Sequence, residues 1–258
     1  MIILKNDIDL LGMKEAAKIA SDSLRLAKKL IKDGVSAKYI DDEIRDFILS
    51  RGGRPSFLGY ETDNKIYNYS TCISINEEVV HGLPKESKIL KAPMIVKVDV
   101  GVEYDGYHSD TAWTFALGEV PQRVILLMKA TKEALYNSIN VAYKGNKVSD
   151  ITYAIYNTVK KYGFEPARGV TGHGIGLELH EDPIIFNHPD DIDADWRIKV
   201  GMGLAIEPMI NMGKGDVKSK RDGWTIVTKD GKWSAHYEHT IFVTREGPII
   251  LTEDIDVR

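Results

Sequence analysis

Apolar side chains recur every three or four positions in four stretches of the chain, with charged residues between them. That spacing is typical of amphipathic helices, which bury one stripe of side chains and expose the other. Ser36 is a suitable N-cap for the second stretch. We therefore expect helices over residues 14–32, 37–50, 122–143 and 150–162.

The second pair of helical stretches repeats the first at a shift of 111 positions. At that shift Gly34 matches Gly145 and Gly52 matches Gly163, and two isoleucines and a proline also coincide. The matches predict an internal duplication, although any two helix pairs that end in glycine can align at some offset.

Each helix pair is followed by stretches rich in strand-forming residues. Helices that precede antiparallel strands, with no flexible linker between the halves, predict the α+β class. We expect a single domain over residues 1–258, whose two halves are related by a pseudo-twofold axis and each contain two helices and antiparallel strands. The expected strand regions are residues 72–76 and 93–115 in the first half and 201–211 and 224–244 in the second.

Composition narrows the class of protein further. With 43% hydrophobic and 28% charged residues the chain is neither disordered nor a coiled coil. The net charge of −4 offers no overall basic field for nucleic acid or anionic membranes, and no apolar run reaches the roughly 18 residues of a membrane span. The lone cysteine, Cys72, cannot form an intrachain disulfide. We expect a cytoplasmic protein with no membrane contact and no sequence-specific nucleic acid partner.

Two aspartates in residues 94–115 are predicted to be neighbours. Valines alternate along the first half of this segment, which puts Asp99 on the opposite face of a strand. The Asp-Gly pair at 105–106 predicts a two-residue hairpin turn, so paired residue numbers sum to 211 and Asp110 lies opposite Gly101. Asp110 is then a diagonal neighbour of Asp99. Two solvated carboxylates on an exposed sheet face are the alternative interpretation.

Other residues of ligand type lie in three later segments. His173 and His180 lie among glycines that permit close approach of the backbone, and Glu207 and Glu238 lie in apolar strand-like runs where an unpaired carboxylate is costly. Each alone is explained as well by a structural hydrogen bond or an ion pair. Together they form a set too rich in oxygen for structural zinc, which suits two divalent first-row ions. The set is Asp99, Asp110, His173, Glu207 and Glu238.

Four of these segments, VDVGVEYDGYHSDT, GHGIGLELHEDP, AIEPMI and SAHYEHTIFVT, closely resemble the motifs of methionine aminopeptidases in order and spacing. The resemblance extends from the first helix to about Thr244 and implies the pita-bread fold. It implies a dinuclear centre in which Asp99 chelates one ion, Asp110 and Glu238 bridge, and His173 and Glu207 bind the second. Cobalt, manganese, iron and zinc are all candidate metals.

The resemblance also implies roles for residues that spacing alone leaves unassigned. His81 corresponds to a histidine that contacts the scissile amide nitrogen, His180 to one that steadies the carbonyl oxygen, and Glu207 to a proton shuttle. A weaker correspondence places a monovalent cation near Asn76 and Ser234. The residues implied for a methionine side-chain pocket are Tyr60, Tyr67 (or Tyr69), Cys72 and Trp224.

Two features indicate the subtype. Only 34 positions separate His173 from Glu207, which leaves no room for the long insertion of type II enzymes, and the chain begins almost directly at its first helix. The similarity is therefore to the short, bacterial-type form of type I. Leu179 stands where an aromatic residue is common, which predicts a more open pocket rim.

The expected activity is removal of the initiator methionine from nascent chains whose second residue is small. The expected partners are nascent polypeptide N-termini, with the ribosome as a further candidate, and a monomer is the default. Two alternatives remain open: a prolidase or aminopeptidase P of the same fold, and a catalytically silent pita-bread module that binds other proteins.

Overall fold

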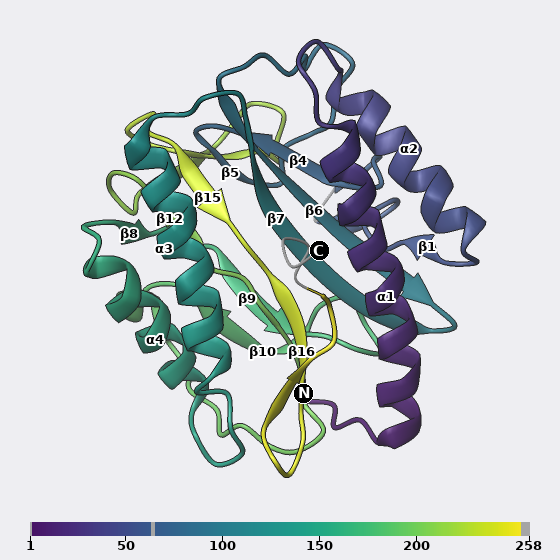
Figure 1. Ribbon diagram of the computed structural model, residues 1–258. Coiled ribbons are helices and arrows are strands. Elements are labelled where there is room, and N and C mark those ends of the chain that lie inside the picture. The colour runs from purple at the N-terminus through teal and green to yellow at the C-terminus, as the bar shows by residue number, and fades with distance from the viewer. Residues whose placement is uncertain (1, 63–64, 254–258) are drawn as a thin grey trace.

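The computed structural model describes residues 2–62 and 65–253, and its helices match the predicted ones closely. The first begins earlier than predicted because Asn6 and Asp9 form a capping box, in which each side chain accepts a hydrogen bond from the other's backbone N–H. Two helices lie on each flank of the molecule (Figure 1). Their bounds are α1 Asp7–Leu30, α2 Ala37–Ser50, α3 Gln122–Ile139 and α4 Val148–Lys160.

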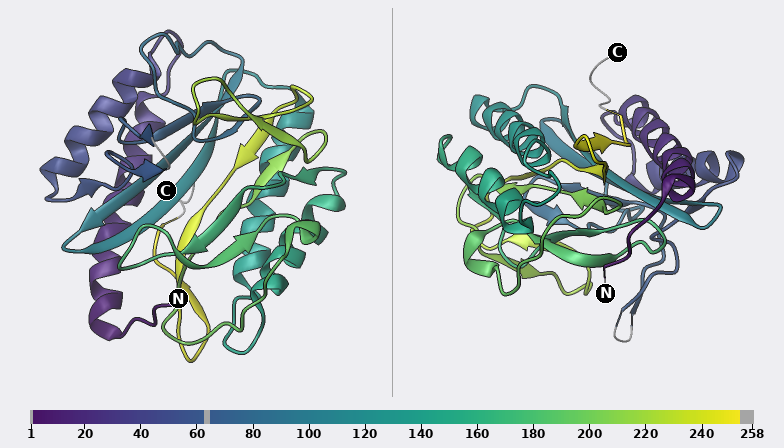
Figure 2. Two further views of the ribbon diagram at one scale, coloured as in Figure 1. Left: turned by 180° about the vertical axis from the view of Figure 1, so that it is seen from behind. Right: turned by 90° about the horizontal axis from the view of Figure 1, so that it is seen from below.

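Antiparallel strands fill the space between the two helix pairs, and the helices cover one side of them (Figure 2). The largest sheet has the order β10-β9-β11-β16-β17, and a second joins β1, β6, β4 and β7. A third sheet has the order β15-β12-β8 and a fourth β13-β14-β5. The strands are β1 Arg54–Pro55, β2 Glu61–Thr62, β3 Lys65–Ile66, β4 Cys72–Ile75, β5 Glu78–Val80, β6 Met94–Tyr104, β7 Tyr107–Leu117, β8 Glu165–Pro166, β9 Thr171–Gly174, β10 Glu181–Phe186, β11 Gly203–Ile206, β12 Met209–Asn211, β13 Val217–Ser219, β14 Ile226–Thr228, β15 Ser234–His236, β16 His239–Val243 and β17 Pro248–Ile250, with a 3₁₀ turn at Pro189–Asp191.

The internal duplication is visible in the element boundaries. α4 begins 111 positions after α2, and β8 lies 111 positions after β1. Short bridges that precede each second helix, Ser36 to Ile89 and Lys147 to Arg197, begin at the same offset. The prediction of an α+β class with two related halves is confirmed.

Equivalent glycines in the two halves should respond equally to mutation. Gly34 and Gly145 have φ of +84° and +93°, and a Cβ added at either would meet nothing within 4 Å. Alanine there should therefore cost only backbone strain, about 1–2 kcal/mol in the free energy of unfolding, in both halves. Urea unfolding of G34A and G145A measures this, and a difference above about 1 kcal/mol between them would contradict the equivalence.

The β6–β7 hairpin has the predicted register. Tyr104 pairs with Tyr107 and Gly101 with Asp110. The valines on one face of β6 are fully buried against the helices, in a core that includes Leu24 and Ile40. The opposite face of β6, which carries Asp99, therefore points away from the helices.

Two predicted strand regions are interrupted where the structure changes sheet. Glu207 lies between β11 and β12, and Glu238 lies between β15 and β16. β11 and β16 belong to the five-stranded sheet, whereas β12 and β15 belong to a three-stranded one. The expectation that both glutamates lie within strands is therefore wrong, because each occupies a two-residue break at the junction of the sheets.

In the part of the chain that the structure describes, the helices are too short or too polar to cross a membrane.

Candidate active site

A cavity of about 860 Å³ collects the predicted site residues from both halves. It lies on the side of β6 that carries Asp99, beside the breaks at Glu207 and Glu238. The predicted residues that line it are Tyr60, Tyr67, Cys72, His81, Asp99, Asp110, His173, His180, Glu207, Trp224 and Glu238. Every residue proposed above as a divalent-metal ligand or as a catalytic group thus faces one cavity.

Donor atoms in and beside this cavity form two overlapping triads. Ligand atoms of Asp110, His173 and Glu238 lie within 4.8 Å of one another, and so do those of Glu207, His236 and Glu238. The Nε2 atom of His173 is 3.7 Å from Oε1 of Glu207 and 4.0 Å from Oδ2 of Asp110. Because Glu238 belongs to both triads, its carboxylate would help to hold a cation at either one.

The donor set fits divalent cations on charge as well as geometry. Oδ1 of Asp99 and Oε1 of Glu238 are buried without a hydrogen-bond partner. Burial, reinforced by the neighbouring carboxylates, raises the pKa values of Asp99, Glu207 and Glu238 well above the usual range. Four crowded carboxylates of this kind are costly unless cations lie between them.

His173 is oriented as a metal ligand would be. Its Nδ1 lies 2.9 Å from the carbonyl oxygen of Gly174, so Nδ1–H donates there and Nε2 is left to face the carboxylates. Burial lowers the pKa of His173 to about 4, which keeps the imidazole neutral. A neutral imidazole is the form that binds metal ions.

His236 is a site residue that the sequence analysis missed. It is fully buried, and its Nε2 is 3.2 Å from Oε2 of Glu207. Burial lowers its pKa to about 3, so it too is neutral. The sequence does carry one indication of this role. In the strand-like segment SAHYEH, His236 lies two positions before Glu238, and alternate side chains of a strand share a face.

The chain breaks between the two histidines of the glycine-rich motif. β9 ends at Gly174 and β10 begins at Glu181, directly after His180. A straight strand would place residues seven apart on opposite faces, but this break brings the rings of His173 and His180 to 4.5 Å. Nδ1 of His180 lies 2.8 Å from the hydroxyl of Tyr60, which leaves Nε2 free to meet a substrate.

His81 is held in an uncommon backbone conformation. Its φ is +56°, in the left-handed region that non-glycine residues rarely adopt. The following residue is fixed by two bonds, from Gly82 N to Ser74 Oγ and from Ile73 N to the Gly82 carbonyl. Strain of this kind concentrates at functional positions, and here it places an exposed imidazole on the cavity wall.

The apolar end of the cavity is formed by aromatic side chains. Tyr67 and Trp224 pack edge to face at 5.1 Å, next to Cys72. Tyr69 packs against Tyr67 at 5.9 Å but does not line the cavity. Leu179 is buried in the same cluster and does not line the cavity, and the more open rim stays a prediction.

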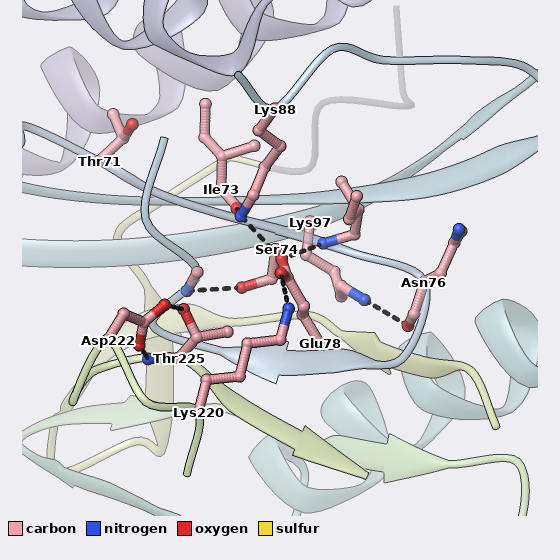
Figure 3. A network of polar contacts seen from close by, with 12 residues as sticks. Thr71, Ile73, Ser74, Asn76, Glu78, Lys88, Lys97, Lys220, Asp222 and Thr225 are labelled. Carbon is pink, nitrogen blue, oxygen red and sulfur yellow. Dashed lines mark hydrogen bonds and ion pairs between the residues drawn. The ribbon is translucent and has the colours of Figure 1, made fainter. Parts of the chain in front are cut away.

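A polar network supports this end of the cavity (Figure 3). Asp222 accepts hydrogen bonds from the backbone N–H groups of Trp224 and Thr225. Nearby, the buried Glu78 carboxylate accepts from Lys88 at 2.8 Å and Lys220 at 2.7 Å, which ties β5 to the segment that follows β13. The network therefore fixes the loop that presents the Trp224 ring.

The position predicted for a monovalent cation is occupied by an ammonium group. Nζ of Lys97 donates to the carbonyl oxygens of Asn76, at 2.8 Å, and Ser234, at 2.9 Å. The Lys97 side chain is fully buried, and burial lowers its pKa to about 7 while Glu78 and Glu77 oppose that shift. Asn76 and Ser234 are thus brought together as expected, but around a side chain of the protein.

Removing divalent ions should make the stability of the protein fall with pH above neutrality. Because the pKa values of Asp99, Glu207 and Glu238 are raised, the folded state holds protons that the unfolded state releases. The free energy of unfolding then decreases as the pH rises toward the pKa values that these carboxylates have in the folded state. Buried histidines, whose pKa values are lowered, make stability rise with pH, but only below about pH 6.5 where the unfolded histidines take up protons. Lys97, whose pKa is about 7, also makes stability rise with pH above that value, and so cancels the effect of one carboxylate.

We therefore expect the urea midpoint of EDTA-treated protein to decrease from about pH 6.5 to pH 8.5, and this decrease to vanish with manganese. A midpoint that rises over this range without metal, or an equal decrease with metal bound, would contradict the assignment of crowded carboxylates.

Comparison with known proteins agrees with a metal-binding site in this cavity. The sequence pattern described as metallopeptidase family M24 matches residues 12–245. The methionine aminopeptidase of Aquifex aeolicus is 43% identical over 244 residues, which cover 93% of this chain and 95% of that one. A crystal structure of methionine aminopeptidase from Thermotoga maritima superposes with a TM-score of 0.93 at 40% identity, over 98% of this chain and all of that one. Prolidase from Pyrococcus furiosus shares the fold, with a TM-score of 0.80 at 20% identity over 98% of this chain and 66% of its own.

Proposed function

This chain belongs to metallopeptidase family M24, and we propose that its cavity is the active site of an aminopeptidase that removes the initiator methionine from proteins whose second residue is small. The observation that carries the proposal is the pair of donor triads that share Glu238 beside an aromatic pocket. The enzyme is a hydrolase, and the similarity to methionine aminopeptidases extends over nearly the full length of both chains.

The residues that would hold two divalent ions are Asp99, Asp110, His173, Glu207 and Glu238, of which Glu238 belongs to both donor triads. Bound there, such ions would polarise the scissile carbonyl and lower the pKa of a water molecule. Manganese, cobalt, iron and zinc all suit carboxylate and imidazole ligands. At the carbonyls of Asn76 and Ser234, Lys97 already donates two hydrogen bonds where a free monovalent cation would bind.

The side chains around the donor set have distinct catalytic roles. His180, held by Tyr60, donates from Nε2 to the substrate carbonyl oxygen as it gains negative charge. Glu207 accepts a proton from the attacking water and delivers it to the amide nitrogen, a role suited to a carboxylate that lines the cavity beside the donor set. His81, on the cavity wall, contacts the same nitrogen. The new C–O bond forms and the C–N bond breaks, so free methionine leaves.

The aromatic end of the cavity is suited to the side chain of an N-terminal methionine. Tyr67, Cys72 and Trp224 provide an apolar surface, with Tyr60 at the side of His180. Methionine is unbranched and has a polarisable sulfur that contacts aromatic rings favourably. We propose that this surface receives the methionine side chain and that residues 1–258 act as one catalytic domain.

The proposed setting is the cytoplasm, and the proposed partners are nascent polypeptide N-termini, with contact to the ribosome as a further element and a monomer as the working form. The net charge of −4 and the absence of a spanning helix in residues 2–62 and 65–253 support a setting without membrane attachment.

Peptide hydrolysis by EDTA-treated enzyme reconstituted with cobalt or manganese tests the proposal. Metal-dependent release of methionine from Met-Ala-Ser, with no cleavage of Ala-Pro peptides, is the expected result. Cleavage before proline would instead support a prolidase or aminopeptidase P. Two bound ions per chain without hydrolysis of either peptide would support a silent binding module.

A further inference from the structure

Lys97 is a buried lysine whose charge is met by backbone rather than by a carboxylate. It lies on β6, on the face that also carries Asp99, and its side chain is 1% exposed. Its Nζ makes two hydrogen bonds, both to carbonyl oxygens, and forms no ion pair within the described residues. The buried carboxylate of Glu78, which acts on the pKa of Lys97, is already paired with Lys88 and Lys220 (Figure 3).

The two carbonyl oxygens come from segments that are far apart in the chain. Asn76 lies in the turn between β4 and β5, in the first half, and has a φ of +45°. Ser234 begins β15, in the second half. The Asn76 carbonyl also accepts from the backbone N–H of Ser234 at 3.0 Å, so the two segments are in direct contact.

Carbonyl oxygens that converge from separate segments form the kind of site that binds a small cation. Here the protein supplies the cation itself. We propose that the Lys97 ammonium is a tethered replacement for a free monovalent cation, which joins the two halves of the fold at this point and makes the protein independent of sodium and potassium.

The location gives this contact a positioning role. The Asn76 turn leads through β5 to His81, and Ser234 leads through β15 to His236 and Glu238. A cation between the two carbonyls therefore holds in place two segments that carry site residues, without itself lining the cavity. The inference concerns this structural contact and holds whichever peptide the enzyme cleaves.

The test measures thermal unfolding of EDTA-treated protein at pH 6.5 in choline, sodium or potassium chloride at equal ionic strength. Wild-type protein should have the same midpoint in all three salts. Lys97→Ala should unfold lower in choline chloride, on the order of 5 °C, because the Ser234 carbonyl loses its Lys97 donor and the Asn76 carbonyl keeps only the Ser234 N–H. Sodium or potassium should restore a large part of this loss in a saturable manner, because the truncated side chain leaves room for the ion.

Two variants make the result specific. Lys97→Met fills the same space without charge, so it should be destabilised and not restored by either ion. Lys160→Ala removes an exposed lysine paired with Glu165 and reports any general effect of the salts. Should Lys97→Ala fail to fold, Lys97→Asn, whose short side chain also leaves space, replaces it under the same criteria.

Two outcomes would overturn the proposal. One is a wild-type midpoint raised by sodium or potassium over choline, which would mean that an ion binds beside the lysine. The other is a folded alanine or asparagine variant that gains nothing from either ion. Neither readout uses peptide hydrolysis, so failure here is distinguishable from failure of the proposed aminopeptidase activity.

Discussion

Replacing Asp110 with alanine is expected to abolish tight divalent metal binding and peptide hydrolysis together. Asp110 is 3% exposed, lies opposite Gly101 in the hairpin, and belongs to the donor triad with His173 and Glu238. Without it, the triad would lose one of its three donors. Since metal ions contribute several kcal/mol to stabilising such transition states, turnover should decrease by at least about 10³-fold.

The measurement is metal content by elemental analysis alongside release of methionine from Met-Ala-Ser. Ser109→Ala is a matched control, because Ser109 precedes Asp110 on β7 and is also buried, yet its hydroxyl has no partner. Asp110→Asn separates charge from shape, since it keeps the side-chain volume and loses the negative charge. Full turnover or two tightly bound ions in the alanine variant would refute the assignment of Asp110 as a ligand.

Replacing His180 with alanine should separate catalysis from metal binding. His180 lies on the cavity wall at 4.5 Å from the His173 ring, but it is not a member of either donor triad. Burial and the neighbouring His173 lower its pKa to about 3, so it is a neutral donor at physiological pH. Loss of one such donor typically lowers turnover by at least about 10²-fold.

We therefore expect a full complement of ions and a greatly reduced kcat in His180→Ala. Tyr60→Phe is the graded control, because it removes only the hydroxyl that lies 2.8 Å from His180 Nδ1, and its loss should be about tenfold or less. An unchanged kcat in His180→Ala would remove this residue from the mechanism, and a parallel loss of metal would make it a structural support for His173 instead.

The sequence predicted those parts of the site that depend on local geometry. An Asp-Gly turn sets the register of a hairpin, so the proximity of Asp99 and Asp110 followed from two residues and the two-residue period of a strand. Likewise, Ser36 marked the start of α2 correctly. The same period explains why the chain must break between His173 and His180 for both rings to face the cavity, as it does.

The parts that depend on contacts between distant segments were not predictable in this way. Glu207 and Glu238 sit where strands leave one sheet for another, and an apolar run of residues carries no signal for such a change. His236 acquires its importance only from its distance to Glu207. Lys97 looks like an ordinary charged residue on a strand until Asn76 and Ser234 are placed around it.

The donor atoms are drawn from both halves of the duplication, from Asp99 to Glu238, and no unfolded chain can hold them together. An ion bound there therefore interacts with the native state alone, and mass action makes apparent stability depend on its supply. Each tenfold increase in free ion above the dissociation constant adds about 1.4 kcal/mol per ion to the free energy of unfolding. A cell that becomes short of the metal would lose enzyme molecules to unfolding and proteolysis as well as losing the activity of those that remain.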